Sequence, residues 1–170
     1  LATSYLFGTE AETDHAEGMG FLTRAAEAGL ARSQYVLGKI HLHGRGVPVN
    51  EAEGRKWIEL AAMQGNERAQ YNMGKLTRDG IGGPADKAVA AGWFLRAAKQ
   101  GYAKAQNHIG TRLARGEGIA KDEAEALFWL TLAARQNHWT AEVNRKALAA
   151  KLPDAIVLAA TKRAEHWKPE

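Results

Sequence analysis

Two histidines separated by a single residue, His41 and His43, are the first candidates for metal chemistry in this sequence. On an α-helix, side chains two positions apart point about 200° away from each other, so this pair could not share one ion without unwinding the helix. The chain has no cysteine, and neither histidine is followed by another four positions later, the spacing that places two ligands on one helix face. We therefore expect no metal site.

Catalytic patterns are also missing from the sequence. Ser4 and Ser33 are its only serines, and neither has a histidine and a carboxylate at a spacing that indicates a triad. Glu123 and Glu125 follow a predicted helix N-cap, where negative charge stabilises the first turn, so they need no acid–base role. The Gly-x-Gly turns precede no strand and lack the lysine of a P-loop. We therefore predict a protein that is not an enzyme and binds no cofactor.

The composition is that of an ordinary globular protein. Its 170 residues, 45% of them apolar and 25% charged, are enough for one domain with a sizeable core. A formal net charge of +4 permits an acidic partner without requiring one. No apolar run reaches the length of a membrane span, and no secretory-signal pattern opens the chain. Because Leu1 stands in place of an initiator methionine, we interpret this end as truncated or processed and expect more protein before it.

A repeat of 36 residues determines where these side chains lie. At this step a glycine returns inside a helical pattern, where glycine costs about 1 kcal/mol relative to alanine. Tryptophans and alanine pairs return at the same step, which is the behaviour of a stacked repeat array. The repeated residues are Gly38, Gly74 and Gly110; Trp57, Trp93 and Trp129; and the alanine pairs that begin at 61, 97 and 133.

Each repeat unit contains two amphipathic helical patterns joined by a glycine-rich turn. In the second unit these patterns cover about 31–43 and 51–64, with Asn50 at the N-cap of the second helix. Glycine follows each second helix in a position that suits a left-handed C′ residue, and Asn137 takes its place in the last unit. No segment alternates as a strand does. The units are 1–29, 30–65, 66–101 and 102–138.

The helix glycines indicate close packing between helices. We expect Gly38 and its equivalents to let a helix of the neighbouring pair approach where a methyl group would clash. Burial of Leu37 and Trp57, at ~1.5–3 kcal/mol per large side chain, outweighs the loss of about 1 kcal/mol in helix propensity. We interpret the three tryptophans as core residues rather than as a stacking platform.

The segment after Asn137 leaves the repeat register. It predicts two further amphipathic helices, divided at Leu152 and Pro153, that form a C-terminal cap over 139–170. His138 stands at the junction, where we expect it to pack or to cap a helix. The whole pattern predicts an all-α fold: a right-handed α-solenoid of stacked antiparallel helix pairs with a C-terminal helical cap.

The unit pattern A-x-x-x-L-G-x-x-Y-x-x-G-x-G-V…D…A…W…A-A-x-x-G resembles the Sel1-like repeat family, which is related to the tetratricopeptide proteins. The third unit departs from it at Thr77, which replaces the tyrosine, and at Gly83, which replaces an aliphatic residue, so we expect altered packing in the turn 80–84. His41 takes the tyrosine position in the second unit, where we expect a buried aromatic substitute; Tyr5 alone keeps the tyrosine. The third unit carries the pattern on Ala69, Gly74, Gly80, Gly82, Asp86, Ala88, Trp93, Ala97, Ala98 and Gly101.

Stacks of helix pairs bind partners through the concave face that their first helices line. On those helices, the stripe opposite the packed glycines holds six lysines or arginines against one acid, Asp79. This surface predicts charge-steered binding of an acidic, extended segment of another protein, with Val36 and either Tyr35 or Tyr71 as apolar anchors. The predicted binding residues are Arg32, Val36, Lys39, His43, Arg68, Asn72, Lys75, Lys104, His108 and Arg115.

The leading functional hypothesis is a non-enzymatic scaffold or adaptor. The resemblance implies a bacterial protein, often exported or periplasmic, that acts in signalling, envelope or secretion processes; the sequence itself does not define the compartment. Three alternatives stay open at this stage. The basic face is merely solvated, or the chain is a nucleic-acid-binding helical repeat, which its modest charge and buried aromatics disfavour. In the third, the repeats regulate an enzyme or a sensor kinase within a larger chain.

Overall fold

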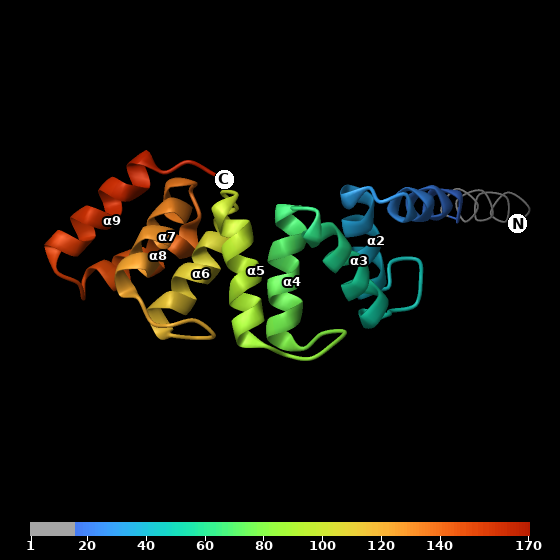
Figure 1. Ribbon diagram of the computed structural model, residues 1–170, viewed down its shortest axis with the longest axis horizontal. Helices are drawn as coiled ribbons and strands as arrows, with labels where there is room; N and C mark the ends of the chain where they lie inside the picture. Colours follow the sequence, from blue (N-terminus) through green and yellow to red (C-terminus); the bar gives the residue numbers. More distant parts are fainter. Residues whose placement is uncertain (1–15) are drawn as a thin grey trace, which may run out of the picture.

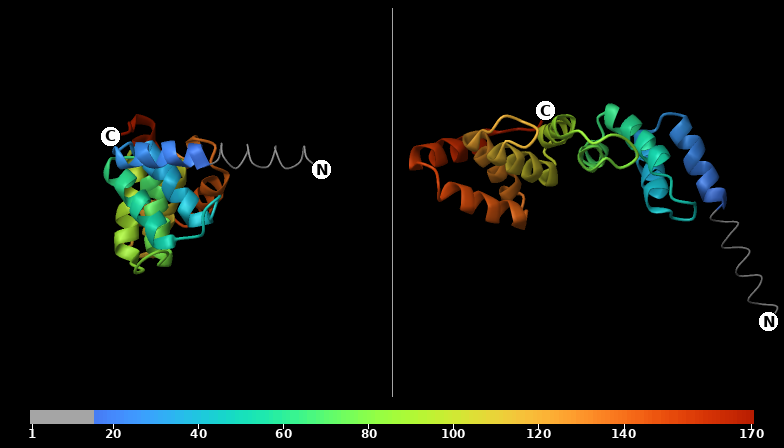
Figure 2. Two further views of the ribbon diagram at one scale, coloured as in Figure 1. Left: turned by 90° about the vertical axis from the view of Figure 1, so that its right-hand side faces the viewer. Right: turned by 90° about the horizontal axis from the view of Figure 1, so that it is seen from below.

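The computed structural model describes residues 16–170, so Ser4 and Tyr5 lie outside the described part of the chain. Within that part all regular structure is helical, and the helices form an elongated row of antiparallel pairs that bends into an arch (Figures 1 and 2). This arrangement confirms the predicted α-solenoid. After helical residues 16–27 come α2 (Ala31–His43), α3 (Glu51–Met63), α4 (Glu67–Asp79), α5 (Lys87–Lys99), α6 (Ala103–Arg115), α7 (Glu123–Arg135), α8 (Trp139–Ala149) and α9 (Asp154–His166). No helix in residues 16–170 has both the length and the apolarity that a membrane crossing requires.

The predicted helix signals act as expected. The side chain of Asn50 accepts a hydrogen bond from the backbone N–H of Glu53 at 3.0 Å, and Asp86 and Asp122 cap α5 and α7 in the same way. At the end of α7, Asn137 has φ = 61°, the left-handed conformation that glycine adopts at the equivalent positions of the other units. These local signals define where each second helix begins and ends.

The helix glycines are tightly packed, but their neighbour is not the one that we predicted. A Cβ on Gly38 would lie 2.8 Å from both the carbonyl oxygen of Gly54 and Cγ1 of Ile58, on the second helix of the same pair. At Gly74 it would lie 2.7 Å from the ring of Phe94, again within one pair. The expectation of close packing is therefore right, and the expectation that a neighbouring pair supplies the contact is wrong.

The close approach between pairs occurs at the turns instead. A Cβ on Gly82 would overlap the carbonyl oxygen of Glu51, the first residue of α3, and Gly118 meets that of Lys87 at the start of α5 in the same way. Both glycines also have positive φ, at 67° and 73°. The turns of the α4–α5 and α6–α7 pairs therefore lie directly on the helix start of the preceding pair, and only glycine fits there.

A buried glutamine ladder, which the sequence reasoning missed, joins successive pairs. The Nε2 of Gln70 donates to the carbonyl oxygen of Ala62 in the preceding pair at 3.2 Å, and its Oε1 accepts from Gln100 at 2.7 Å. The same contacts occur one repeat before it and one repeat after it, at Gln34 and Gln106. The 36-residue step of these glutamines was the available signal.

The irregular turn of the third unit is accommodated by Arg55 of α3. Its guanidinium donates to the hydroxyl oxygen of Thr77 and to the carbonyl oxygen of Ile81, each at 3.3 Å. A side chain at Gly83 would press on this group, because a Cβ there would lie 3.2 Å from Cζ of Arg55. The altered packing expected around residues 80–84 is thus a polar contact between units.

The tyrosine position of the second unit is only partly buried. His41 is half-buried rather than fully enclosed, and its Nδ1 has no hydrogen-bond partner among the described residues.

The two C-terminal helices do not pair with each other. Both pack on α7, on different sides, and they scarcely touch one another. His138 caps α8, accepting at Nδ1 from the backbone N–H of Ala141 at 3.3 Å, which confirms its capping role. The chain end then returns to α5, where Glu170 forms an ion pair with Lys99 at 2.9 Å (Figure 1).

Candidate partner-binding face

The first helices of successive pairs lie next to one another and are joined by polar side chains 37 positions apart. The Tyr35 hydroxyl accepts from Asn72 at 3.3 Å, and the Tyr71 hydroxyl and His108 Nε2 are 3.2 Å apart. A bond of 3.0 Å between Asn144 and Asn107 continues the series into α8. We call this surface of α2, α4, α6 and α8 the first-helix face.

Four of the predicted binding residues meet in one cleft on this face. Lys39 and His43 of α2 and Asn72 and Lys75 of α4 all line a cleft of ≈ 290 Å³. We call this the basic cleft. Its other lining residues are Leu42, Glu51, Leu76, Asp79 and Ile81, so its floor is largely apolar.

The two lysines of the basic cleft form no ion pair with any described residue, although two carboxylates, Glu51 and Asp79, also line it. Burial, followed by repulsion from Lys75 and Arg45, lowers the pKa of Lys39. The pKa of His43 is also lowered, chiefly by the charge of Lys39. Neither Lys39 nor Lys75 has an ion-pair partner within residues 16–170, whereas the nearby acid Asp79 is already bound to Arg78. The ammonium groups of Lys39 and Lys75 therefore stay available to an anionic group.

The other predicted residues do not join this cluster. Arg32, Arg68 and Lys104 are exposed at the helix starts, and Val36 is 38% exposed beside them. Arg115 lies at the far end of α6, with its guanidinium 3.6 Å from Glu117.

His108 lies within the packing between α4 and α6 rather than on open surface. Its ring stacks on Phe94 with centroids 4.8 Å apart, and burial lowers its pKa to about 4, so it is neutral at physiological pH. Tyr71 is likewise held against Tyr102 and Phe94, with ring centroids 5.3 Å and 5.8 Å away. Neither side chain is free to serve as an anchor without rearrangement, and Tyr35 also packs against the core, whereas Val36 is exposed.

Two further arginines on this side were missed by the sequence reasoning. Arg78 of α4 and Arg112 of α6 stand near the basic cleft, and Arg112 is only 7% exposed. The repeat offered the signal, since residues 36 positions from Arg112 are Leu76 and Leu148. A charged residue at a position that is apolar elsewhere in the repeat indicates that this side chain has a function other than packing.

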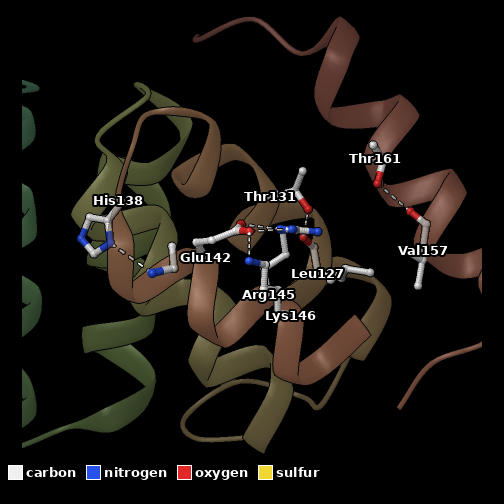
Figure 3. A network of polar contacts seen from close by, with 9 residues as sticks. Leu127, Thr131, His138, Glu142, Arg145, Lys146, Val157 and Thr161 are labelled. Atoms are coloured by element: carbon white, nitrogen blue, oxygen red, sulfur yellow. Dashed lines mark hydrogen bonds and ion pairs between the residues drawn. The ribbon is translucent and has the colours of Figure 1, made fainter. Parts of the chain in front are cut away.

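A second, larger cleft of ≈ 570 Å³ lies between α7, α8 and α9. Figure 3 shows the polar contacts in this region. Several of its polar groups already have hydrogen-bond partners. Glu142 accepts two hydrogen bonds from Arg145, at 2.8 and 2.9 Å, and these lower its pKa to about 2. The Thr131 and Thr161 hydroxyls donate to carbonyl oxygens of their own helices. Arg135 also lines this cleft and has no ion-pair partner among the described residues, so one of its cations stays unpaired. Residues 16–170 contain no cluster of three or more side chains suited to a metal ion.

Comparisons with known proteins agree on one family. The Sel1 repeat matches this chain four times, over residues 1–30, 31–66, 67–102 and 103–138. A crystal structure of a Sel1 repeat protein from Oxalobacter formigenes superimposes with a TM-score of 0.72 at 31% identity, covering 76% of this chain and 98% of that one.

A second solved structure is c5321, described as a protective antigen present in uropathogenic Escherichia coli strains and displaying an SLR fold. It has a TM-score of 0.72 at 26% identity and covers 89% of this chain. The chain spans only 36% of that protein's length. No curated protein matches the chain.

Proposed function

Because the chain belongs to the Sel1 repeat family, whose members generally act as scaffolds for protein–protein interaction, we propose that it is a scaffold or adaptor that binds a protein partner through the first-helix face. We further propose that the partner presents an acidic, extended segment. The supporting observation is the basic cleft, in which Lys39 and Lys75 lie near each other and neither is within ion-pair distance of a carboxylate among the described residues, although Glu51 and Asp79 also line the cleft.

The energetics indicate how such a segment would be held. Exposed ion pairs contribute ~0.2–1 kcal/mol each, so the lysines alone give weak, salt-sensitive attraction. The apolar floor at Leu42, Leu76 and Ile81 offers surface for an aliphatic side chain, at about 25 cal/mol per Å² buried. A segment that alternates acidic and apolar residues matches both features.

Fluorescence anisotropy with a labelled peptide rich in Glu and Leu tests this proposal. We expect the peptide to bind the wild-type chain, and binding to weaken as salt screens the charges. A control peptide with Gln in place of every Glu keeps the shape and removes the charge, so it should bind much more weakly.

A charge-matched pair of protein variants locates the site. The double variant Lys39→Gln/Lys75→Gln should bind roughly 2- to 30-fold more weakly, since it loses two ion pairs. Lys87→Gln/Lys162→Gln loses the same charge at exposed positions outside the face and should bind like the wild type. Equal affinity for the Glu and Gln peptides, or equal loss in both variants, would refute the proposal.

A further inference from the structure

Arg112 of α6 is a nearly buried cation without a carboxylate partner. It is 7% exposed, yet no Asp or Glu oxygen of the described chain lies within ion-pair distance of it. Its guanidinium lies over the Phe94 ring, 4.7 Å from the centroid. Nη1 is 3.4 Å from Nδ1 of His108 and 3.5 Å from its carbonyl oxygen. Buried charges are almost always paired, so this arrangement needs a reason.

Packing does not require an arginine at this position. The residues 36 positions before and after it are Leu76 and Leu148, which are 6% and 8% exposed. A leucine therefore fills the corresponding place on α4 of the preceding unit and on the cap helix α8. The charge of Arg112 is an addition to the repeat pattern.

Charges of both signs surround Arg112, and one of them, Asp79, also lines the basic cleft. Burial, followed by repulsion from Arg78 of the adjacent α4 and from Arg115, lowers the pKa of Arg112. Asp79 and Glu117 attract it from beyond ion-pair distance, and Asp79 is held by Arg78 through two hydrogen bonds. Nε and Nη2 of Arg112 bond to no acceptor of the described chain. One edge of the guanidinium is thus free to bind a carboxylate in the forked geometry that arginine favours.

We propose that Arg112 is a specificity-determining residue of the first-helix face and binds one carboxylate of the partner's acidic segment. This inference rests on the proposed function and adds a direction to it. The segment runs from the basic cleft between α2 and α4 to Arg112 on α6. Neighbouring helix axes are about 8–10 Å apart, so the path is on the order of 20 Å, which about six residues of extended peptide span.

The variant Arg112→Leu distinguishes a role of Arg112 in partner binding from a role in packing. Its affinity for the labelled Glu- and Leu-rich peptide and its melting temperature are both measured. We expect binding to weaken at least tenfold, because a charge-assisted hydrogen bond is lost. We also expect the melting temperature of the free protein to rise, because a nearly buried cation gives way to a leucine found at two equivalent positions. A purely structural arginine predicts the opposite: a lower melting temperature and unchanged binding.

Two further variants complete the test. Arg112→Lys keeps the positive charge but loses the two parallel N–H donors of the guanidinium. This variant should fold like the wild type and bind the peptide several-fold more weakly. Arg135→Leu removes an exposed arginine outside the first-helix face and should leave binding unchanged.

The outcomes distinguish the two proposals. If the wild-type chain fails to bind the peptide at low salt, both are wrong. If binding depends on Lys39 and Lys75 but is unchanged in Arg112→Leu and Arg112→Lys, this inference alone is overturned.

Discussion

Replacing Gly74 with alanine tests the packing inside a helix pair. The new Cβ would lie 2.7 Å from Cδ1 and Cε1 of Phe94 and 2.9 Å from its Cζ, whereas carbon atoms pack best about 3.5–4.0 Å apart. Phe94 is fully buried, so its ring cannot turn away into solvent. Overpacking of this kind costs about 1–3 kcal/mol, against a gain of about 1 kcal/mol in helix propensity. We expect Gly74→Ala to lower the free energy of unfolding by about 0–2 kcal/mol.

Gly92 supplies the matched control, because it is exposed inside α5 and a Cβ there would meet no atom within 4 Å. Gly92→Ala should therefore stabilise the protein by about 1 kcal/mol. The two substitutions are chemically identical, yet their unfolding free energies should differ by roughly 1–3 kcal/mol. For a chain of this size that difference corresponds to about 2–12 °C in melting temperature. Thermal and urea unfolding, followed by circular dichroism and tryptophan fluorescence, measures both.

A second background identifies the clashing group. Leucine has no atoms in place of Cε1 and Cζ of Phe94, so Gly74→Ala should destabilise the Phe94→Leu protein less than it destabilises the wild type. The double variant should therefore be more stable than the sum of the two single losses predicts. If Gly74→Ala and Gly92→Ala raise the melting temperature equally, Gly74 is not packed as described. If the coupling is zero, Phe94 is not the neighbour that matters.

Two further predictions concern the buried polar groups. The pKa of His108 is near 4 when folded and 6.5 is its ordinary value, so the unfolded chain binds more protons between these limits and stability must fall as pH drops from about 6.5 to about 4. His108→Asn should flatten this dependence by about 1–2 kcal/mol, after allowance for the remaining exposure of the ring, in urea titrations across that range. Gln70→Ala should lower the free energy of unfolding by about 1–3 kcal/mol, because it leaves the Ala62 carbonyl oxygen and the Gln100 side chain without their partner. Gln64→Ala, at an exposed position where only one bond is lost, should cost less; equal effects would show that the ladder does not link the pairs.

The candidate site was only partly readable in advance. The repeat step placed Lys39 and Lys75 at equivalent positions of adjacent units, and in the structure they share one cleft. The same reasoning placed His108 on the predicted face by its register, although its side chain is stacked on Phe94. Register states which side of a helix a residue occupies, but burial depends on how far the next helix overlaps that side.

The order of residues alone settles the all-α repeat architecture, because its signals act over a few positions. A capping side chain such as Asn50 bonds three residues ahead, and a left-handed residue such as Asn137 ends a helix wherever it stands. The order of residues did not determine which helices contact each other. Which helix meets Gly38, and that Arg112 lacks a carboxylate, depend on distances between segments that only the packed chain brings together.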